Sequence, residues 1–315
     1  MVNTEMVSAV RKKQRRLLTM KKYGLLFSRY AYPMALFIVF YIYVNINSIV
    51  MTFQTVNVDG SKNWVAFQNY IDFIKNVSNG GSLLGTSALN SVKLYFINLV
   101  ISLPLYIIFS YILYKKFKGH NIMRAVVMIP QVVSGMVIAL LFKKFISDAL
   151  PEMMIQFFGY KEFPDLLASE EYAFGTIVFY GIWISFATSL IVYSNAMGAI
   201  DEEIMDSAHI DGVFTMWGEL RYIILPLMYP TLCTFIVTGF AAFPTNDAHV
   251  MTFYERNAAK NLYTIGYYYN VAILKNETSG YNLLAAGGLI MSLILTPLTF
   301  LLKWALEKFG PSEDK

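Results

Sequence analysis

The stretch GAIDEEIMDSAHIDGVFTMWGELRYIILPLMYP, from Gly198 to Pro230, joins two long apolar runs that contain no charged residue. Apolar residues recur in it at helical spacing, which predicts helix rather than irregular loop. Gly212 interrupts the pattern, and a glycine at this point permits the positive φ angle of a sharp corner. We therefore expect two short helices, joined by a corner, between two membrane spans.

The composition indicates a membrane protein. Of the 315 residues, 56% are hydrophobic and 15% are charged, whereas about one quarter of the residues in a soluble domain are charged. The net charge of +4 comes from basic residues in the segments beside the spans, where they set the orientation of the spans. It does not imply nucleic-acid binding. The single cysteine, Cys233, excludes an internal disulfide, and no metal site is expected around it.

Apolar runs of about 20 residues predict transmembrane helices, so we expect an all-α membrane protein with six spans. The first run is long enough to span the membrane and follows a long basic segment, which favours a retained helix over a cleaved signal peptide. The transmembrane domain is expected at 30–305, between a basic tail at 1–29 and a second tail at 306–315. The predicted spans lie at about 32–53, 91–114, 123–143, 173–197, 222–243 and 281–303.

The distribution of Lys and Arg predicts the orientation. Six spans place both termini and the loops after the second and fourth spans on the same side, and that side carries sixteen of the 25 basic residues. Cytoplasmic loops carry the excess of Lys and Arg. We therefore expect both termini, and the loop 198–221, in the cytoplasm.

The charge of this loop is unlike that of a cytoplasmic loop that lies on anionic lipid. It holds one base, Arg221, and six carboxylates: Asp201, Glu202, Glu203, Asp206, Asp211 and Glu219. Its apolar side chains, Val213, Phe214, Met216 and Trp217, are expected to be exposed unless the loop docks. An exposed apolar patch rimmed by charge marks a protein interface, so these residues favour a partner with a basic rim around an apolar cleft. Packing of the loop on its own helical bundle is the alternative.

Several residues of this loop resemble the EAA loop of ABC-importer permeases, whose pattern is E-A-A-x-x-D-G followed by I-x-L-P-x-x-x-P. The residues that carry the resemblance are Asp206-Ser207-Ala208, Asp211-Gly212, Ile224, Leu225-Pro226 and Pro230. Asp and Ser replace the first Glu and Ala of the pattern. The series from Asn90 to Lys144 is similar to the two-helix signature of the same family.

The resemblance implies the fold of a type I ABC importer permease, whose EAA loop forms coupling helices that dock on an ATPase subunit. The residues it assigns to docking are Asp206, Ser207, Ala208, Asp211, Gly212, Trp217 and Pro226. It also implies a second permease subunit, two ATPase subunits and an extracytoplasmic solute-binding protein. The membrane would be the plasma membrane of a prokaryote.

No catalytic motif is present, and the chain has no G-x-x-x-x-G-K-[ST] sequence to hold ATP phosphates. We therefore expect a transport subunit rather than an enzyme, with no cofactor bound by this chain and ATP used by a separate ATPase subunit. Swinging of the docked loops would rock the spans between outward-open and inward-open states.

Almost no charge lies within the predicted spans, so no ion-coupling carboxylate is indicated. Amides, hydroxyls and aromatic rings suit a neutral, polyhydroxylated solute, although helix packing explains such residues as well. The resemblance is to the maltose- and glycerol-phosphate-type branch, which implies a mono- or oligosaccharide. The candidate path residues are Asn98, Trp183, Ser185, Thr188, Ser189, Asn195 and Asn246.

Three alternatives remain at this point. An ABC importer permease of this kind could instead carry a non-sugar solute, such as an amino acid, a polyamine or a phosphonate. A self-contained secondary sugar transporter would explain the spans but not the acidic loop. A membrane-anchored scaffold would explain the acidic loop but not the polar residues of the fourth span.

Overall fold

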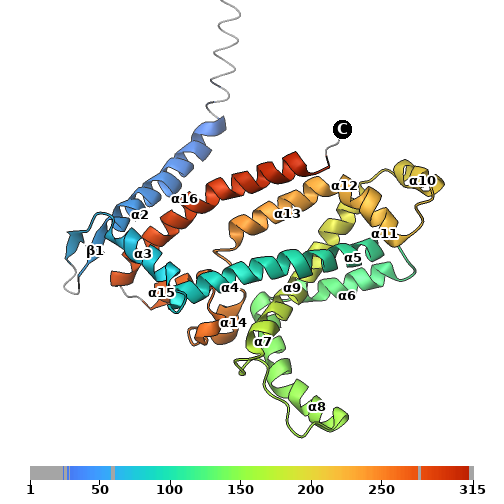
Figure 1. Cartoon of the computed structure of the whole chain (residues 1–315), viewed down its shortest axis with the longest axis horizontal. Coiled ribbons are helices and arrows are strands. Elements are labelled where there is room, and N and C mark those ends of the chain that lie inside the picture. The colour runs from blue at the N-terminus through green and yellow to red at the C-terminus, as the bar shows by residue number, and fades with distance from the viewer. Residues whose placement is uncertain (1–23, 25–26, 28, 58–60, 276–277, 312–315) are drawn as a thin grey trace, which may run out of the picture.

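The computed structural model describes residues 24, 27, 29–57, 61–275 and 278–311. Most of the predicted basic tail and the last four residues lie outside this set. Helices account for most of what is described (Figure 1). A two-stranded antiparallel hairpin, β1 (Gln54–Val56) and β2 (Lys62–Trp64), is the one sheet in these residues.

The first apolar run forms one helix, Arg29–Thr52, which contains a π-helical segment, Phe37–Tyr43, and ends as α2, Val44–Thr52. The apolar window of this helix is not buried anywhere within the chain, as expected for side chains that face lipid. At the left of Figure 1, α2 lies beside α16 (Thr278–Phe309). Helix α3, Gln68–Ser78, follows the hairpin and also packs on α16.

The second span is a continuous helix of 32 residues, Leu83–Tyr114. It consists of α4 (Leu83–Ile97), a π-helical segment (Asn98–Ser102) and α5 (Leu103–Tyr114). It begins before the predicted residue 91 because Ser82 caps it: the hydroxyl accepts a hydrogen bond of 3.0 Å from the Gly85 N–H. Such a cap satisfies an N–H group that the helix itself cannot pair.

The third predicted span, 123–143, is not one straight helix. Helix α6, His120–Val132, and the helix that begins with α7, Gly135–Lys144, meet at an angle of 98°. Val133 is extended and Ser134 is also non-helical at the break. Pro130 lies about one turn before the break, where its ring removes a helical hydrogen bond. The second helix continues through a π-helical segment, Phe145–Ala149, into α8, Leu150–Phe158, which projects from the body in Figure 1.

The fourth span, α9 (Ala173–Gly198), lies close to its predicted place. The fifth, predicted at 222–243, is broken instead: Met216–Leu227 and α13 (Tyr229–Ala242) meet at 72°. Pro226 and Pro230 flank this break, and both lack the N–H that would continue the helix. The remaining outer elements are α14 (Val250–Tyr254), a 3₁₀ turn (Lys260–Leu262) and α15 (Ile265–Leu274).

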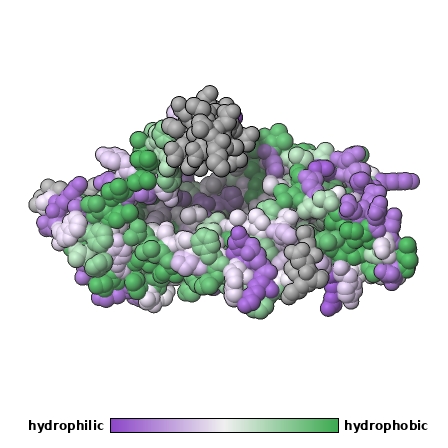
Figure 2. Space-filling model, turned by 90° about the horizontal axis from the view of Figure 1, so that it is seen from above, coloured by the Kyte–Doolittle hydropathy of each residue, from purple (hydrophilic) through white to green (hydrophobic). Residues whose placement is uncertain are grey.

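Four helices of the described residues are long and apolar enough to cross a membrane, and the number is six if each bent pair is one span. The chain is thus an all-α membrane protein. Figure 2 shows apolar residues over large parts of one face. Hydrophilic residues gather at its right-hand end, which is the end that carries α10 in Figure 1.

Two buried apolar clusters hold the helices together. One joins α7, α9, α14 and α15, and Phe142, Tyr180 and Phe253 contact each other within it. The other joins α5 and α9 to the segment 220–232. The buried Asn90 amide of α4 donates to the backbone oxygens of Asn261, at 2.7 Å, and Tyr263, at 2.9 Å, and Tyr263 belongs to the first cluster.

Two adjacent glycines of α16 allow a test of this packing. A Cβ on Gly287 would collide with the Phe73 ring of α3 and with the Tyr269 hydroxyl, whereas a Cβ on Gly288 would meet nothing within 4 Å. We expect Gly287→Ala to destabilise the chain by about 1–3 kcal/mol, the usual cost of overpacking. Its melting temperature in detergent should fall by several degrees.

Gly288→Ala is the matched control, because alanine favours a helix by about 0.5–1 kcal/mol over glycine and has room at this position. Its melting temperature should be unchanged or slightly raised. Equal melting temperatures for the two variants would contradict the close contact between α16 and α3.

Candidate functional site

The acidic segment after α9 forms α10, Glu202–Ile210, a corner at Asp211–Gly212, and α11, Met216–Glu219. A π-helical segment, Leu220–Ile224, and α12, Leu225–Leu227, then lead to α13. Gly212 has a φ of +90°, and a Cβ there would meet nothing within 4 Å. The backbone conformation, rather than close packing, therefore requires a glycine at this corner.

The next helix is fixed at its start by a side chain. The Thr215 hydroxyl accepts a hydrogen bond of 3.2 Å from the Gly218 N–H at the first turn of α11. The two short helices therefore have defined directions, and they lie at the right-hand end of the molecule in Figure 1, away from α8.

The predicted docking residues are mainly on the surface of this loop. Asp206, Ser207, Asp211, Gly212 and Trp217 are exposed, whereas Ala208 and Pro226 are half-buried.

Three large apolar side chains stand out from the surface of the loop. The exposed fractions are 87% for Ile210, 73% for Phe214 and 66% for Trp217. Val213 and Met216, also expected to be exposed, are instead half-buried. Ile210, Phe214 and Trp217, with the exposed carboxylates beside them, form an exposed face that we call the docking face, after the prediction from the sequence.

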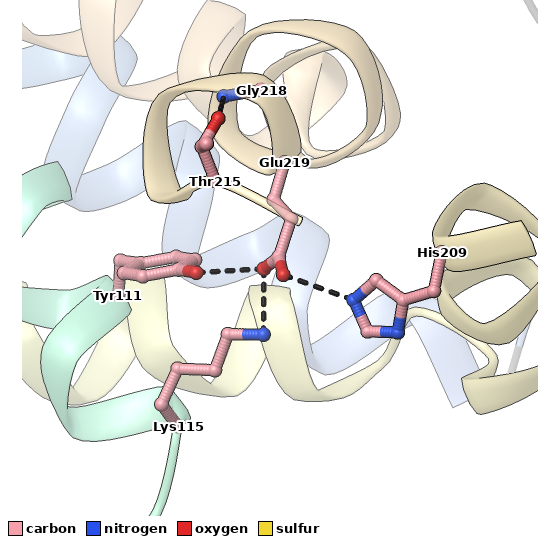
Figure 3. A network of polar contacts seen from close by, with 6 residues as sticks. All are labelled: Tyr111, Lys115, His209, Thr215, Gly218 and Glu219. Atoms are coloured by element: carbon pink, nitrogen blue, oxygen red, sulfur yellow. Dashed lines mark hydrogen bonds and ion pairs between the residues drawn. The ribbon is translucent and has the colours of Figure 1, made fainter. Parts of the chain in front are cut away.

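One of the six carboxylates does not belong to this face. Glu219 is 3% exposed and points inward (Figure 3). Its Oε2 accepts hydrogen bonds from the Tyr111 hydroxyl at 2.7 Å and the Lys115 ammonium at 2.6 Å, and its Oε1 is 3.1 Å from His209 Nε2. These three groups occupy both oxygens of Glu219, which is not among the residues predicted to dock.

The groups around Glu219 determine its charge. Burial is the largest single effect and would raise the pKa of this carboxyl, but the hydrogen bonds from Lys115, Tyr111 and His209 and the charge of Lys115 together outweigh burial and lower the pKa. A carboxylate without such partners would be costly in a buried position. Glu219 is thus held as an anion that joins α11 to α10 and to the end of α5.

A buried apolar cluster lies directly beneath the loop. Leu220, Ile224 and Met228, which follow α11, pack against Tyr106 and Tyr111 of α5. Tyr193 and Met197 of α9 belong to the same cluster. The loop therefore rests on two helices that also line a cavity.

This cavity has a volume of about 500 Å³ and opens between α4, α5, α9 and α13. Four of the predicted path residues line it: Asn98, Ser185, Ser189 and Asn246. None of the residues that line it in the described part of the chain is Asp, Glu, Lys or Arg. A small adjoining cavity of about 80 Å³ is lined by Asn98, Ser185, Asn246 and also His249.

Other lining residues were missed from the sequence although they follow a simple pattern. The lining residues Ser91, Tyr95, Ser102 and Tyr106 of the second span lie three or four positions from one another or from the predicted Asn98, so all five form one face of a helix. The signal in the sequence is the recurrence of polar and aromatic residues at helical intervals around Asn98.

The other predicted path residues lie elsewhere. Trp183 packs in an aromatic cluster, with its ring centroid 5.9 Å from that of Phe142. Thr188 contacts the Gln131 amide of α6. Asn195 is exposed near the end of α9, and like Trp183 and Thr188 it is absent from the cavity lining. Among the described residues, no group of three His, Cys, Asp or Glu side chains could hold a metal ion.

A family model described as "Binding-protein-dependent transport system inner membrane component" matches residues 81–313, from before the second span to the C-terminal tail. The chain belongs to this family. It is a multi-pass inner-membrane component of a transport system, and the match includes both the loop and the cavity.

Curated relatives are similar to most or part of the chain. The chain is 23% identical to the arabinooligosaccharides transport system permease protein AraP of Bacillus subtilis (strain 168). The aligned 269 residues cover 82% of this chain and 81% of that protein. It is 26% identical to the galactooligosaccharides transport system permease protein GanP of the same organism, over 40% of this chain and 30% of that protein.

A further relative is the multiple sugar-binding transport system permease protein MsmF of Streptococcus mutans serotype c (strain ATCC 700610 / UA159). The identity is 29%, over 44% of this chain and 48% of that protein.

Solved structures show the same fold. One chain of a bacterial ABC transporter involved in the import of the acidic polysaccharide alginate superposes with a TM-score of 0.76, at 17% identity, over 93% of this chain and 99% of that one. A second chain comes from the bacterial alginate ABC transporter in complex with an alginate pentasaccharide-bound periplasmic protein. It superposes with a TM-score of 0.72, at 17% identity, over 90% of this chain and 94% of that one. The fold is thus that of a type I ABC importer permease.

The corner at Gly212 gives a prediction about transport. Leucine at φ of +90° would be strained by about 1–2 kcal/mol, which favours a loop with a different angle between α10 and α11. We expect Gly212→Leu to reduce solute uptake about tenfold in cells with the same amount of the chain in their membranes. Uptake and an immunoblot of the membrane fraction measure the two quantities.

Gly198→Leu is the control. A Cβ at Gly198 also meets nothing within 4 Å, but its φ is not positive, so this variant should take up solute normally. Normal uptake by Gly212→Leu as well would mean that the positive φ is not needed.

Proposed function

We propose that this chain is the permease subunit of an ATP-driven importer and forms half of the translocation path for a neutral mono- or oligosaccharide. The observation that carries this proposal is the cavity of about 500 Å³ whose lining residues combine hydroxyls, amides and aromatic rings and include no charged side chain. Sugars are bound by hydrogen bonds to their hydroxyls and by aromatic contacts with their apolar faces.

The absence of charge in this lining bears on the kind of sugar. Alginate, the solute of the solved relatives, is acidic, and an anionic solute would favour basic side chains along its path. The names of the curated relatives concern arabinooligosaccharides and galactooligosaccharides. Both the lining and these relatives support a neutral saccharide for this chain.

The partners follow from the loop and the family. Ile210, Phe214 and Trp217 would enter an apolar cleft of an ATPase subunit, with basic residues of that subunit around Asp206 and Asp211. Such an arrangement takes affinity from the apolar contacts and orientation from the charges. A second permease subunit, a second ATPase subunit and an extracytoplasmic sugar-binding protein complete the importer.

The orientation and the energy source are part of the same proposal. The loop and both termini lie in the cytoplasm, consistent with the excess of Lys and Arg on that side. ATP binds and is hydrolysed on the ATPase subunits, and this chain holds no cofactor. Closure of the ATPases moves the docked loops, and the spans rock between outward-open and inward-open states.

Co-purification tests the assembly. The chain is tagged in its native cell and extracted in mild detergents, and the proteins that accompany it are identified by mass spectrometry. We expect an ATPase with a phosphate-binding loop and a second permease chain. Recovery of this chain alone in every mild detergent, with the loop intact, would favour a self-contained transporter.

Charge reversal on the loop tests docking. Asp206 is exposed on α10, so Asp206→Lys would place a cation against the basic cleft of the ATPase. Because like charges across an interface are unfavourable, we expect the yield of ATPase in a pull-down to fall about tenfold. The yield is measured at low ionic strength, where charge effects are least screened.

Glu152→Lys is the matched control, since Glu152 is an exposed carboxylate on α8, far from the loop. It should leave the yield unchanged. An unchanged yield with Asp206→Lys would argue against a basic partner at this position.

Removal of a polar group tests the path. Asn98 lines both cavities, and Asn98→Leu removes its hydrogen-bonding capacity. A sugar hydroxyl left unpaired there costs about 1–3 kcal/mol. We expect uptake of radiolabelled sugar at low concentration to fall at least about tenfold, while the ATPase still co-purifies.

Asn195→Leu is the control, because Asn195 does not line the cavity. This variant should take up the sugar at the normal rate. Equal uptake by the two variants would remove Asn98 from the path. The sugar used in both cases is the one that the purified binding protein of the same system binds.

A further inference from the structure

The strongest unexplained feature is the burial of one anion in a loop that is otherwise exposed. Glu219 has a side chain that is 4% exposed, and both of its oxygens are occupied. A surface carboxylate would serve equally well if the loop needed only negative charge. The position of Glu219 therefore calls for an explanation within the chain.

On one side, the contacts of Glu219 lead to the docking face. His209 of α10, which bonds to Oε1, stacks on Phe214 with ring centroids 5.8 Å apart and planes inclined by 13°. Phe214 is one of the three exposed apolar side chains of that face. A displacement of the docking face would thus act on Glu219 through His209.

On the other side, the contacts lead to the cavity. Tyr111 and Lys115, which bond to Oε2, lie at the end of α5 and just beyond it. Tyr106, five residues earlier, lines the cavity, and its hydroxyl donates to the Ile182 oxygen of α9 at 3.1 Å. At about 1.5 Å per residue, roughly 8 Å of rigid helix separates the Glu219 contacts from the cavity wall.

Apolar packing alone would not fix this connection. Leu220 and Ile224 contact α5 in the cluster beneath the loop, but apolar contacts are not directional. A segment held by them alone can slide over its support. Charge-assisted hydrogen bonds are directional and shorter than neutral ones, so the bonds of Glu219 fix the register of α11 on α5.

We propose that Glu219 is a positioning residue that fixes α11 on the end of α5 and thereby passes movement of the docked loop to the wall of the sugar cavity. The inference rests on the proposed function, since it concerns an importer driven by an ATPase. It assigns the bonds to Tyr111, Lys115 and His209 a role in coupling beyond folding. Without them the loop docks and moves, but α5 does not follow it.

The test compares sugar transport with ATP hydrolysis in the complete importer, reconstituted in vesicles with its ATPase and binding protein. We expect Glu219→Gln to assemble in normal yield and to hydrolyse ATP, while the number of sugars transported per ATP falls at least about tenfold. Lys115→Met should act in the same direction. Lys115 is 38% exposed, and this second variant leaves the Glu219 carboxylate with its bonds to Tyr111 and His209 alone.

Rescue by exchange of the charges separates positioning from folding. Lys115→Glu and Glu219→Lys should each uncouple the importer, and the double variant should regain most of the sugar transported per ATP. A role in stability alone would lower the melting temperature without changing this ratio.

The Lys303–Glu307 pair of α16 supplies a control, because its atoms lie 3.6 Å apart and its side chains are 56% and 61% exposed. Glu307→Gln should leave the ratio unchanged.

The outcomes distinguish the two proposals. If the unmodified importer transports no sugar, the proposed function fails. If it transports sugar and both Glu219→Gln and Lys115→Met keep the original ratio of sugar to ATP, or if the exchanged pair assembles without recovery, the role of Glu219 is wrong.

Discussion

The packing of α5 on α9 is the contact on which the candidate site depends. Tyr106 of α5 donates a hydrogen bond to the Ile182 oxygen of α9, and the same two helices supply part of the cavity wall and the apolar support of the loop. A bilayer offers no water to pair exposed backbone groups, so spans in it are helices that pack through side chains. Both halves of the site therefore share one structural support.

The two halves of the candidate site, the loop and the cavity, differ in the chemistry of their surfaces. The loop presents large apolar side chains and carboxylates to the surface, which suits contact with another protein. The cavity presents hydroxyls, amides and aromatic rings without charge, which suits a solute that passes through rather than remaining bound. Glu219 belongs to neither surface, and its bonds connect the loop to α5 between them.

The breaks in the third and fifth spans shape the rest of the fold. At Val133 the chain turns by 98° and carries α8 away from the body. At Met228 it turns by 72°, which allows α11 and α12 to lie across the end of the bundle while α13 enters it. Proline lies close to both turns, but Pro104 and Pro297 lie within helices that continue. Proline alone thus does not predict where a span breaks.

The sequence by itself determined the membrane class, the position of the acidic loop and the corner at Gly212, because apolar runs, charge and glycine act locally along the chain. Only the tertiary structure decided that Glu219 is buried, since its partners Tyr111 and Lys115 are more than a hundred positions away. It also decided that Ser185 and Ser189 face the cavity while Thr188 does not. Which face of a helix meets its neighbours depends on packing between distant segments, and no local pattern fixes that.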